Sequence, residues 1–180
     1  MQTLDLRCAP EWQIGFIGAC YFIGNVLGNS SLSHMGDTYG RIRMLRVGFV
    51  LSCILYAMMI YSAHSKPLVF LLLFLLGFLS PVRLNFSFIY GSEIIKTSHS
   101  TVICSFYNFF DGLTMIQASL YYKYISRDWF YLYWYFLSIC IFGSVLSFMM
   151  PESPRYLICK GDFKRARQSF NFIAWMNGRK

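Results

Sequence analysis

Two ionisable side chains interrupt long apolar stretches of this sequence, and they are its first candidates for chemistry. Arg83 lies ten residues before Glu93, where one apolar stretch ends, and Asp111 lies eleven residues after Ser100, where the next one begins. At 1.5 Å per helical residue, these offsets correspond to about 15 and 16 Å. On neighbouring antiparallel helices, Arg83 and Asp111 are therefore expected at the same depth and facing each other.

A charged group inside a bilayer is costly unless it is paired or functional, which leaves three interpretations of these two residues. They form a structural ion pair, they contact a transported solute or a proton, or they do neither. Arg83 and Asp111 are therefore candidate functional residues, and the family resemblance described below implies that their helices border a transport cavity. If they pair, Asp111→Asn is expected to leave Arg83 uncompensated and to lower the yield of protein.

Catalytic chemistry is not expected of this chain. Its six cysteines show no C-x-x-C spacing, and four of them lie inside apolar stretches, where cysteine usually behaves as a small hydrophobic residue. Neither the cysteines nor the three histidines are interpreted as a nucleophile–base pair or a metal cluster. The sequence therefore predicts no catalytic residue, no metal site and no cofactor.

A polar elbow, residues 151–155, separates the last apolar stretch from a basic tail. The stretch from Trp129 to Met150 carries no charge, whereas the tail is rich in Lys and Arg. Pro151 ends an apolar helix, and Pro154 is suited to the first turn of a short helix. Glu152 and Arg155 lie beside these prolines and are candidates for ionic contacts at the membrane surface.

Residues 33–43 are predicted to form the tight loop between the first two apolar segments. Gly40 permits a turn with positive φ, and Asp37 can cap a helix or pair locally. Arg41 adds a basic side chain at the membrane boundary. Before this loop, Gly15 with Ala19 and Gly24 with Gly28 form two small-x-x-x-small pairs, which indicate close packing of helices within one protein or, alternatively, a homodimer face.

The composition places these elements in a membrane. The chain has 180 residues, of which 56% are hydrophobic and 13% are charged, against about 25% charged residues in soluble domains. Its net charge of +8 comes mainly from short segments between apolar stretches, which is typical of a multi-span protein and not of a nucleic-acid-binding one. The fold class is therefore predicted as an all-α integral membrane protein.

Three parts are expected along the chain: an extracytosolic segment 1–12, a five-span region 13–150, and a cytosolic elbow with a basic amphipathic helix, 151–180. The predicted transmembrane helices are 13–34, 45–65, 67–93, 101–123 and 129–150. Eleven basic residues fall on the side of the tail and four on the other side. This imbalance predicts an N-terminus outside and a C-terminus in the cytosol or its equivalent, in a plasma or organellar membrane.

The sequence Pro-Glu-Ser-Pro-Arg-Tyr-Leu at 151–157 resembles the segment that closes the N-terminal half of sugar-porter and organic-cation-transporter proteins of the major facilitator superfamily. The loop 33–43 resembles the signature loop of that superfamily, Gly-x-x-x-Asp-Arg-x-Gly-Arg-Arg/Lys. Ser33 replaces its leading Gly and Thr38 its first Arg. Residues 5–12 resemble the end of an extracellular loop whose cysteine takes part in a disulfide-bearing domain, so Cys8 is either free or paired outside this sequence.

The resemblance implies that the chain corresponds to family helices two to six, a partial N-terminal half. It also implies a cytosolic gate built from the signature loop, the end of the third segment and the elbow, with the candidate residues Asp37, Gly40, Arg41, Glu93, Glu152 and Arg155. Within this set a salt bridge is expected between Glu93 and Arg155, and a second contact between Asp37 and Arg41.

Two functions remain open at this level. The first is transport of a small solute, of the organic cation, organic anion or sugar class, by alternating access as part of a larger carrier. The second is a transport-inactive structural subunit of a larger membrane complex. Gly40, Glu93 and the elbow favour the first, whereas Thr38, Leu73 and His99, which replace family residues, favour the second. The expected partners are a small solute, the lipid bilayer and either a missing second half or other membrane subunits, with no nucleic acid.

Overall fold

The computed structural model describes residues 10–61, 65–95, 100–125, 129–176 and 178. Cys8, His99 and most of the predicted segment 1–12 lie outside these residues. Helices account for the elements of the described chain, and no strand occurs among them. They are α1 (Glu11–Tyr39), α2 (Arg41–Tyr61), α3 (Lys66–Ile94), α4 (Ser100–Leu120), the π-helical turn Tyr121–Ile125, α5 (Trp129–Met149), α6 (Pro154–Cys159) and α7 (Phe163–Met176).

Each of the five predicted apolar segments coincides with a long helix, which confirms the all-α fold. Three of these helices are long and apolar enough to cross a membrane: Arg41–Tyr61, Pro67–Ile94 and Trp129–Met149. Helix α1 continues to Tyr39, beyond the predicted end at residue 34, and α2 begins at Arg41. The predicted loop 33–43 is therefore wrong in extent, because the positive φ of Gly40 reverses the chain by itself.

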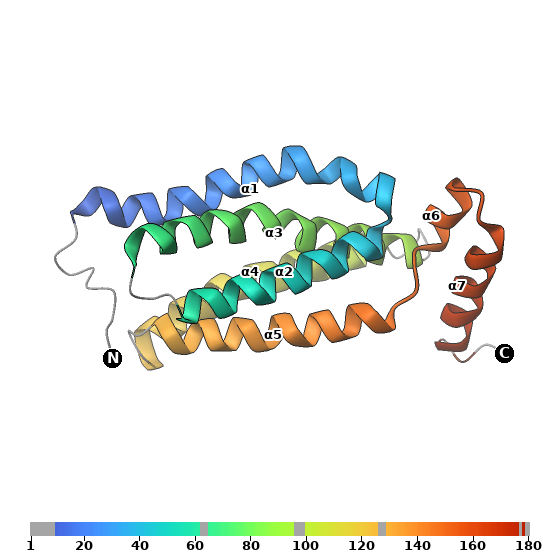
Figure 1. Ribbon diagram of the computed structural model, residues 1–180. Coiled ribbons are helices and arrows are strands. Elements are labelled where there is room, and N and C mark those ends of the chain that lie inside the picture. Colours follow the sequence, from blue (N-terminus) through green and yellow to red (C-terminus); the bar gives the residue numbers. More distant parts are fainter. Residues whose placement is uncertain (1–9, 62–64, 96–99, 126–128, 177, 179–180) are drawn as a thin grey trace.

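The five long helices lie side by side and alternate in direction, as Figure 1 shows. Helix α3 packs against both α1 and α2, and α2 also packs against α5. Because five antiparallel helices end opposite to where they began, the start of α1 and the helices α6 and α7 lie at opposite ends of the bundle (Figure 1). The end that carries residues 151–155 is called the elbow end below.

Glycines bring α1 and α3 into backbone contact. A Cβ atom added at Gly24 would lie 2.2 Å from the Phe74 carbonyl oxygen, and one added at Gly28 would lie 2.1 Å from that of Phe78. In the same way, a Cβ atom on Gly77 of α3 would lie 2.1 Å from the Tyr21 carbonyl oxygen. The pair of Gly24 and Gly28 therefore serves packing within one protein, the first of the two predicted alternatives.

Two buried apolar clusters hold α2 against α3. The cluster at the elbow end contains Ile42, Leu45, Val82, Phe86 and Tyr90. The cluster at the opposite end contains Met59, Val69, Leu72 and Leu76, with Trp129 and Tyr133 of α5 packed against it. Together with the packing of α1 on α3 and of α5 on α2, these contacts make α1, α2, α3 and α5 the closely packed part of the bundle.

Helix α4 is joined to this part only loosely. None of its described side chains is buried, and Cys104, Tyr107 and Ala118 are half-buried. The Tyr107 hydroxyl donates to the Leu84 carbonyl over 2.9 Å, and Gln117 Nε2 donates to Tyr135 Oη over 2.7 Å. A mainly apolar cavity of about 820 Å³ lies between α4 and α5.

Candidate functional site

Arg83 points into the bundle and not toward Asp111. Its guanidinium carbon lies 5.7 Å from the centre of the Tyr56 ring of α2, and its Nε atom is buried without a hydrogen-bond partner among the described residues. None of the ion pairs within the described chain includes Arg83 or Asp111. The predicted ion pair between them is therefore wrong.

The loose packing of α4 and the direction of the Arg83 side chain explain this outcome. Tyr107, one turn before Asp111 on nearly the same face of α4, reaches α3, since its hydroxyl donates to the carbonyl of Leu84, next to Arg83. Its ring also lies 5.4 Å from that of Phe88. Asp111 is exposed instead. The sequence predicted that Arg83 and Asp111 lie at a similar depth along neighbouring helices, but it did not predict the directions of their side chains.

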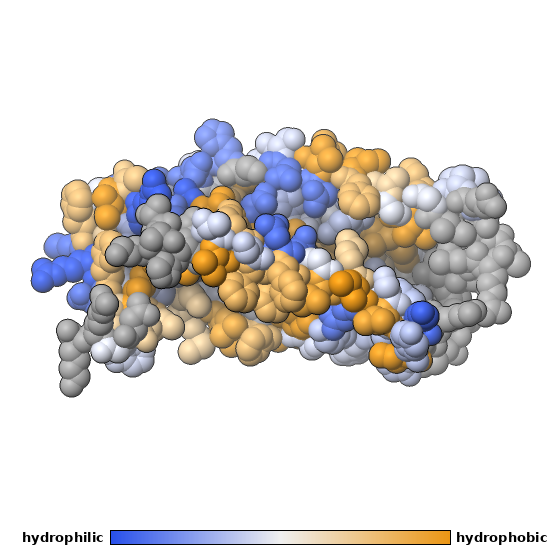
Figure 2. Space-filling model, turned by 180° about the vertical axis from the view of Figure 1, so that it is seen from behind, coloured by the Kyte–Doolittle hydropathy of each residue, from blue (hydrophilic) through white to orange (hydrophobic). Residues whose placement is uncertain are grey.

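Three helices, α1, α3 and α4, carry exposed polar side chains in their middle turns. Asn85 Nδ2 of α3 donates to Asn29 Oδ1 of α1 over 2.8 Å, and this pair is exposed. Asn108 and Asp111 of α4 are exposed as well. Figure 2, which views the molecule from the side of α4, shows hydrophilic surface that reaches the middle of this face between apolar regions. Exposed polar groups thus come from α1, α3 and α4.

At the elbow end, Arg41 joins two carboxylates from different helices. Its Nη2 atom lies 3.0 Å from Asp37 Oδ1, four residues earlier, and its Nη1 atom lies 2.9 Å from Glu93 Oε1 at the end of α3. The Glu93 side chain is 6% exposed, whereas that of Asp37 is 66% exposed. The Arg41–Glu93 contact is therefore the shielded half of this arrangement, and it ties the start of α2 to the end of α3.

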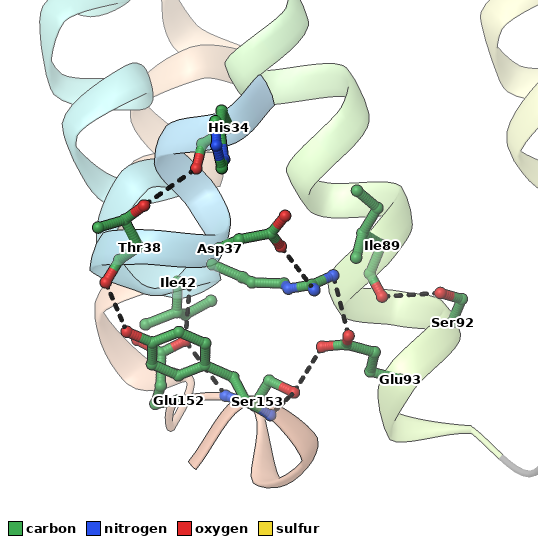
Figure 3. Close-up of polar contacts among 11 residues, drawn as sticks. His34, Asp37, Thr38, Ile42, Ile89, Ser92, Glu93, Glu152 and Ser153 are labelled. Carbon is green, nitrogen blue, oxygen red and sulfur yellow. Dashed lines mark hydrogen bonds and ion pairs between the residues drawn. The ribbon is translucent and has the colours of Figure 1, made fainter. Parts of the chain in front are cut away.

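The elbow is tied to the same point, as Figure 3 shows. The Ser153 hydroxyl donates to Glu93 Oε2 over 2.6 Å, and its oxygen accepts the backbone N–H of Tyr156, which caps α6. Glu152 Oε1 accepts the backbone N–H groups of Ile42, over 3.0 Å, and of Ser153, over 3.3 Å. Since the first N–H groups of a helix lack partners within it, Glu152 completes the start of α2.

Gly40 is required at this junction for two reasons. Its φ of 105° is a conformation that side chains disfavour. A Cβ atom there would also lie 2.7 Å from Glu152 Oε2. The predicted turn with positive φ at Gly40 is confirmed, and the structure adds that the absent side chain makes room for the Glu152 carboxylate.

Arg155 takes no part in this cluster. It is exposed, and no ion pair of the described chain includes it. The predicted Glu93–Arg155 salt bridge is wrong because Arg41 occupies Glu93, while Ser153, two residues before Arg155, makes the elbow's contact with that carboxylate. The predicted contact between Asp37 and Arg41 is present.

Three further side chains make long-range contacts at the elbow end, and sequence reasoning missed them. Arg46 donates through Nε to the Ser147 carbonyl, over 3.0 Å, and through Nη2 to that of Met150, over 2.7 Å, which satisfies the last carbonyls of α5. The Tyr90 hydroxyl donates to the Pro151 carbonyl over 2.8 Å, and the Tyr156 hydroxyl to that of Thr38 over 3.1 Å. The Ser153-Pro154 pair was a readable capping signal, whereas these long-range contacts carry none.

Groups that could hold a metal ion, with three or more His, Cys, Asp or Glu side chains together, are absent from the described residues. Cys20, Cys53, Cys104, Cys140 and Cys159 are free thiols. Chemically, the elbow end offers a set of ionic and hydrogen-bonded contacts between the ends of helices. Such contacts hold helix ends together, and they are broken when those ends move apart.

Comparison with known proteins agrees with this architecture. The chain is 28% identical to the human organic cation/carnitine transporter 2 over 181 residues, which cover 97% of this chain and 31% of that protein. It is 26% identical to the mouse organic cation/carnitine transporter 2 over 184 residues, with the same two shares. It is 25% identical to organic cation transporter 1 of Caenorhabditis elegans over 177 residues, which cover 97% of this chain and 30% of that protein.

The chain thus spans about a third of the length of the curated relatives that it matches. A family model described as "Sugar (and other) transporter" matches residues 3–179, nearly the whole chain. The resemblance predicted from the elbow and the signature loop is confirmed by these matches. On this evidence, the chain is an integral membrane protein that belongs to the Sugar (and other) transporter family.

Proposed function

We propose that this chain takes part in transmembrane transport of a small solute by alternating access, as part of a larger carrier. The observation that carries the proposal is the contact of Arg41 with Glu93 and of Glu93 with Ser153, which joins α2, α3 and the elbow at one end of the bundle. Alternating access needs contacts that close one end of a transporter and are released when that end opens. Asp37, Gly40, Arg41, Glu93 and Glu152 are arranged as such a closure, and Arg155 lies at its exposed edge.

The proposed topology has five transmembrane helices. Besides the three apolar helices, α1 has 29 residues and α4 has 21, about 43 and 32 Å at 1.5 Å per residue, against a hydrocarbon core of about 30 Å. The excess of Lys and Arg in the tail and in the Gly40 junction places the elbow end on the cytosolic side. Residues 13–150 form the membrane region in this proposal, with residues 1–12 outside and 151–180 inside.

The solute is proposed to meet the polar face that Asn29, Asn85 and Asp111 share. Asp111 is exposed on α4 and has no ion-pair partner within the described residues. Because a carboxylate at membrane depth must face water, a partner or a solute, Asp111 is the first candidate for solute contact. Arg83 packs on Tyr56 behind this face and supports it from within the bundle. The proposed solute class is organic cation, organic anion or sugar; the names of the relatives support the first and the description of the family supports the last.

A second candidate function is that of a structural membrane subunit without transport. One observation favours it: Thr38 stands where the family's signature loop has an Arg, and its hydroxyl donates to the His34 carbonyl of its own helix over 3.2 Å. This position therefore supplies no charge to a switch between conformations. The loose packing of α4 is consistent with a helix that contacts another polypeptide in a complex, and it is equally consistent with a helix that moves during transport.

The test begins with mild detergent extraction of the protein from its native membrane, followed by its intact mass and its list of co-purifying chains. The purified material is then reconstituted in vesicles for uptake of labelled carnitine, tetraethylammonium and glucose. Uptake that Asp111→Asn abolishes supports transport. Stoichiometric association with a large complex, with no uptake of any solute class, supports the structural subunit and contradicts transport.

A further inference from the structure

A small polar pocket opens at the elbow end, separate from the Arg41–Glu93 contact. Its volume is about 360 Å³. Its walls come from the last turn of α1, the first turn of α2, the elbow, α6 and the start of α7, and they include Thr38, Arg43, Glu152, Tyr156, Lys160 and Arg165. A cavity of this size admits a headgroup-sized ligand.

The anionic side chains of this pocket already have partners. Glu152 accepts the backbone N–H groups of Ile42 and Ser153. Asp162 lies 3.4 Å from Arg165 Nε and accepts the backbone N–H of the same residue over 3.2 Å. Neither carboxylate forms an ion pair with Arg43 or Lys160, and the three cations of the lining, Arg43, Lys160 and Arg165, outnumber the two carboxylates.

Two cations of the pocket form no ion pair within the described residues. Arg43 and Lys160 are exposed, and neither has a carboxylate within ion-pair distance in the described parts of the chain. The Lys160 ammonium lies 5.7 Å from the centre of the Tyr156 ring, which keeps it beside the pocket. With Arg165 at the margin, the pocket presents donors and positive charge to an anion that has several oxygens.

The position of the pocket indicates where the anion comes from. Tyr39 and Phe163 beside it are 57% and 69% exposed, as aromatic residues are at the boundary between membrane and water. In the proposed topology, this boundary is the cytosolic leaflet, whose surface is rich in anionic lipids. The favoured source of a phosphate at this boundary is therefore a lipid headgroup, and the alternative source is a soluble phosphate compound.

We propose that this pocket binds a phosphate group, supplied by the headgroup of an anionic phospholipid of the cytosolic leaflet. Arg43 and Lys160 contact the phosphate oxygens, and Arg165 screens the remaining charge. A bound headgroup bridges the Gly40 junction and α6, so it favours the arrangement in which the elbow is seated. The inference rests on the proposed topology for the leaflet, but binding itself is measured without transport.

The experiment compares two double variants of the full chain purified in a non-ionic detergent. Arg43→Gln with Lys160→Gln removes the two cations that form no ion pair within the described residues, and Lys164→Gln with Arg167→Gln removes the same charge from exposed positions of α7 outside the pocket. Native mass spectrometry measures how much phosphatidylinositol and how much phosphatidylcholine each protein retains. Circular dichroism verifies that the helix content is unchanged. We expect the pocket variant to bind phosphatidylinositol roughly tenfold more weakly or worse, and the control variant to bind it within about twofold of the parent.

Equal loss of lipid in both variants, or loss in neither, overturns the proposal, because binding would then follow overall charge or other surfaces. Equal retention of phosphatidylcholine and phosphatidylinositol by the parent protein also overturns it. A further arm adds millimolar inorganic phosphate or inositol phosphate to the detergent sample. Binding of these compounds without binding of the lipid supports the phosphate site and overturns the lipid as its source. Failure of uptake in vesicles bears only on the proposed function, since lipid retention does not depend on it.

Discussion

Arg41 and Glu93 form a shielded ion pair between α2 and α3, with Arg41 Nη1 2.9 Å from Glu93 Oε1. The Glu93 carboxylate receives the Ser153 hydroxyl on its other oxygen, so one carboxylate links two helices and the elbow. Loss of the Glu93 charge should therefore weaken the contacts of α3 with both α2 and the elbow.

Glu93→Gln is expected to lower the free energy of unfolding by about 3 kcal/mol, because it leaves the partly buried Arg41 with only the exposed Asp37 as partner. Asp37→Asn is the matched control and should cost less than about 1 kcal/mol, since its side chain is 66% exposed. Thermal unfolding of the purified variants in one detergent measures both. Equal losses for the two would show that the shielded contact has no special weight.

Gly40→Ala is expected to destabilise the protein by roughly 1–3 kcal/mol, through an unfavourable φ and through crowding of the Glu152 carboxylate. Gly112→Ala in α4 is its control, because nothing lies within 4 Å of a Cβ atom there and the residue is helical. That control should be neutral or stabilising by up to about 1 kcal/mol. Comparison of the two melting temperatures decides the matter, and a harmless Gly40→Ala would contradict the described turn.

Gly24→Ala is expected to separate α1 from α3, because its new methyl group would lie 2.2 Å from the Phe74 carbonyl oxygen. Since backbone atoms cannot move aside as a side chain can, we expect a loss on the order of 2 kcal/mol. Gly15→Ala, on the same helix but with open space around it, should be neutral. Unfolding in detergent followed by tryptophan fluorescence reads out both variants. A tolerated Gly24→Ala would mean that the two helices are less closely packed than described.

Asp111→Asn is expected to change the free energy of unfolding by less than about 0.5 kcal/mol, because Asp111 is exposed and forms no ion pair with Arg83. This reverses the loss of yield that the paired arrangement predicts. Uptake in reconstituted vesicles should nevertheless fall if Asp111 contacts the solute. Ser119→Ala, at an exposed position about two turns away on the same helix, is the control for nonspecific effects on α4. A strong loss of stability in Asp111→Asn alone would restore the ion pair.

Arg83→Met is expected to be nearly neutral or stabilising, since replacing a buried charge that has no carboxylate partner by an apolar side chain of similar length removes a desolvation cost. In the Arg83→Met protein, Tyr56→Leu should then change the free energy of unfolding only slightly, because the contact between the guanidinium and the ring is already absent. Both are measured by thermal unfolding in detergent. A loss of several kcal/mol in Arg83→Met would point to a partner that the described residues do not contain.

The sequence by itself determined the helices of this protein and the point at which the membrane region ends. Long uncharged stretches can satisfy their backbone groups in lipid only as helices, so the composition of 129–150 predicts a helix before any contact is known. The Asp37–Arg41 contact was also predicted, as a local pairing within the signature loop between residues close in sequence. Pro154 predicted the start of α6, because proline is favoured in the first turn of a helix, and Ser153 before it is a favourable N-cap residue.

Only the tertiary structure decided which charged groups meet. Spacing along a helix gives a depth, but the direction of a side chain and the closeness of its neighbours depend on how the helices pack. Arg83 lies over the Tyr56 ring of α2, and Asp111 lies on α4, which has no buried side chain among its described residues. In the same way, Glu93 meets Arg41 and not Arg155, because contacts between residues far apart in sequence follow from how whole helices pack, and no local pattern encodes them.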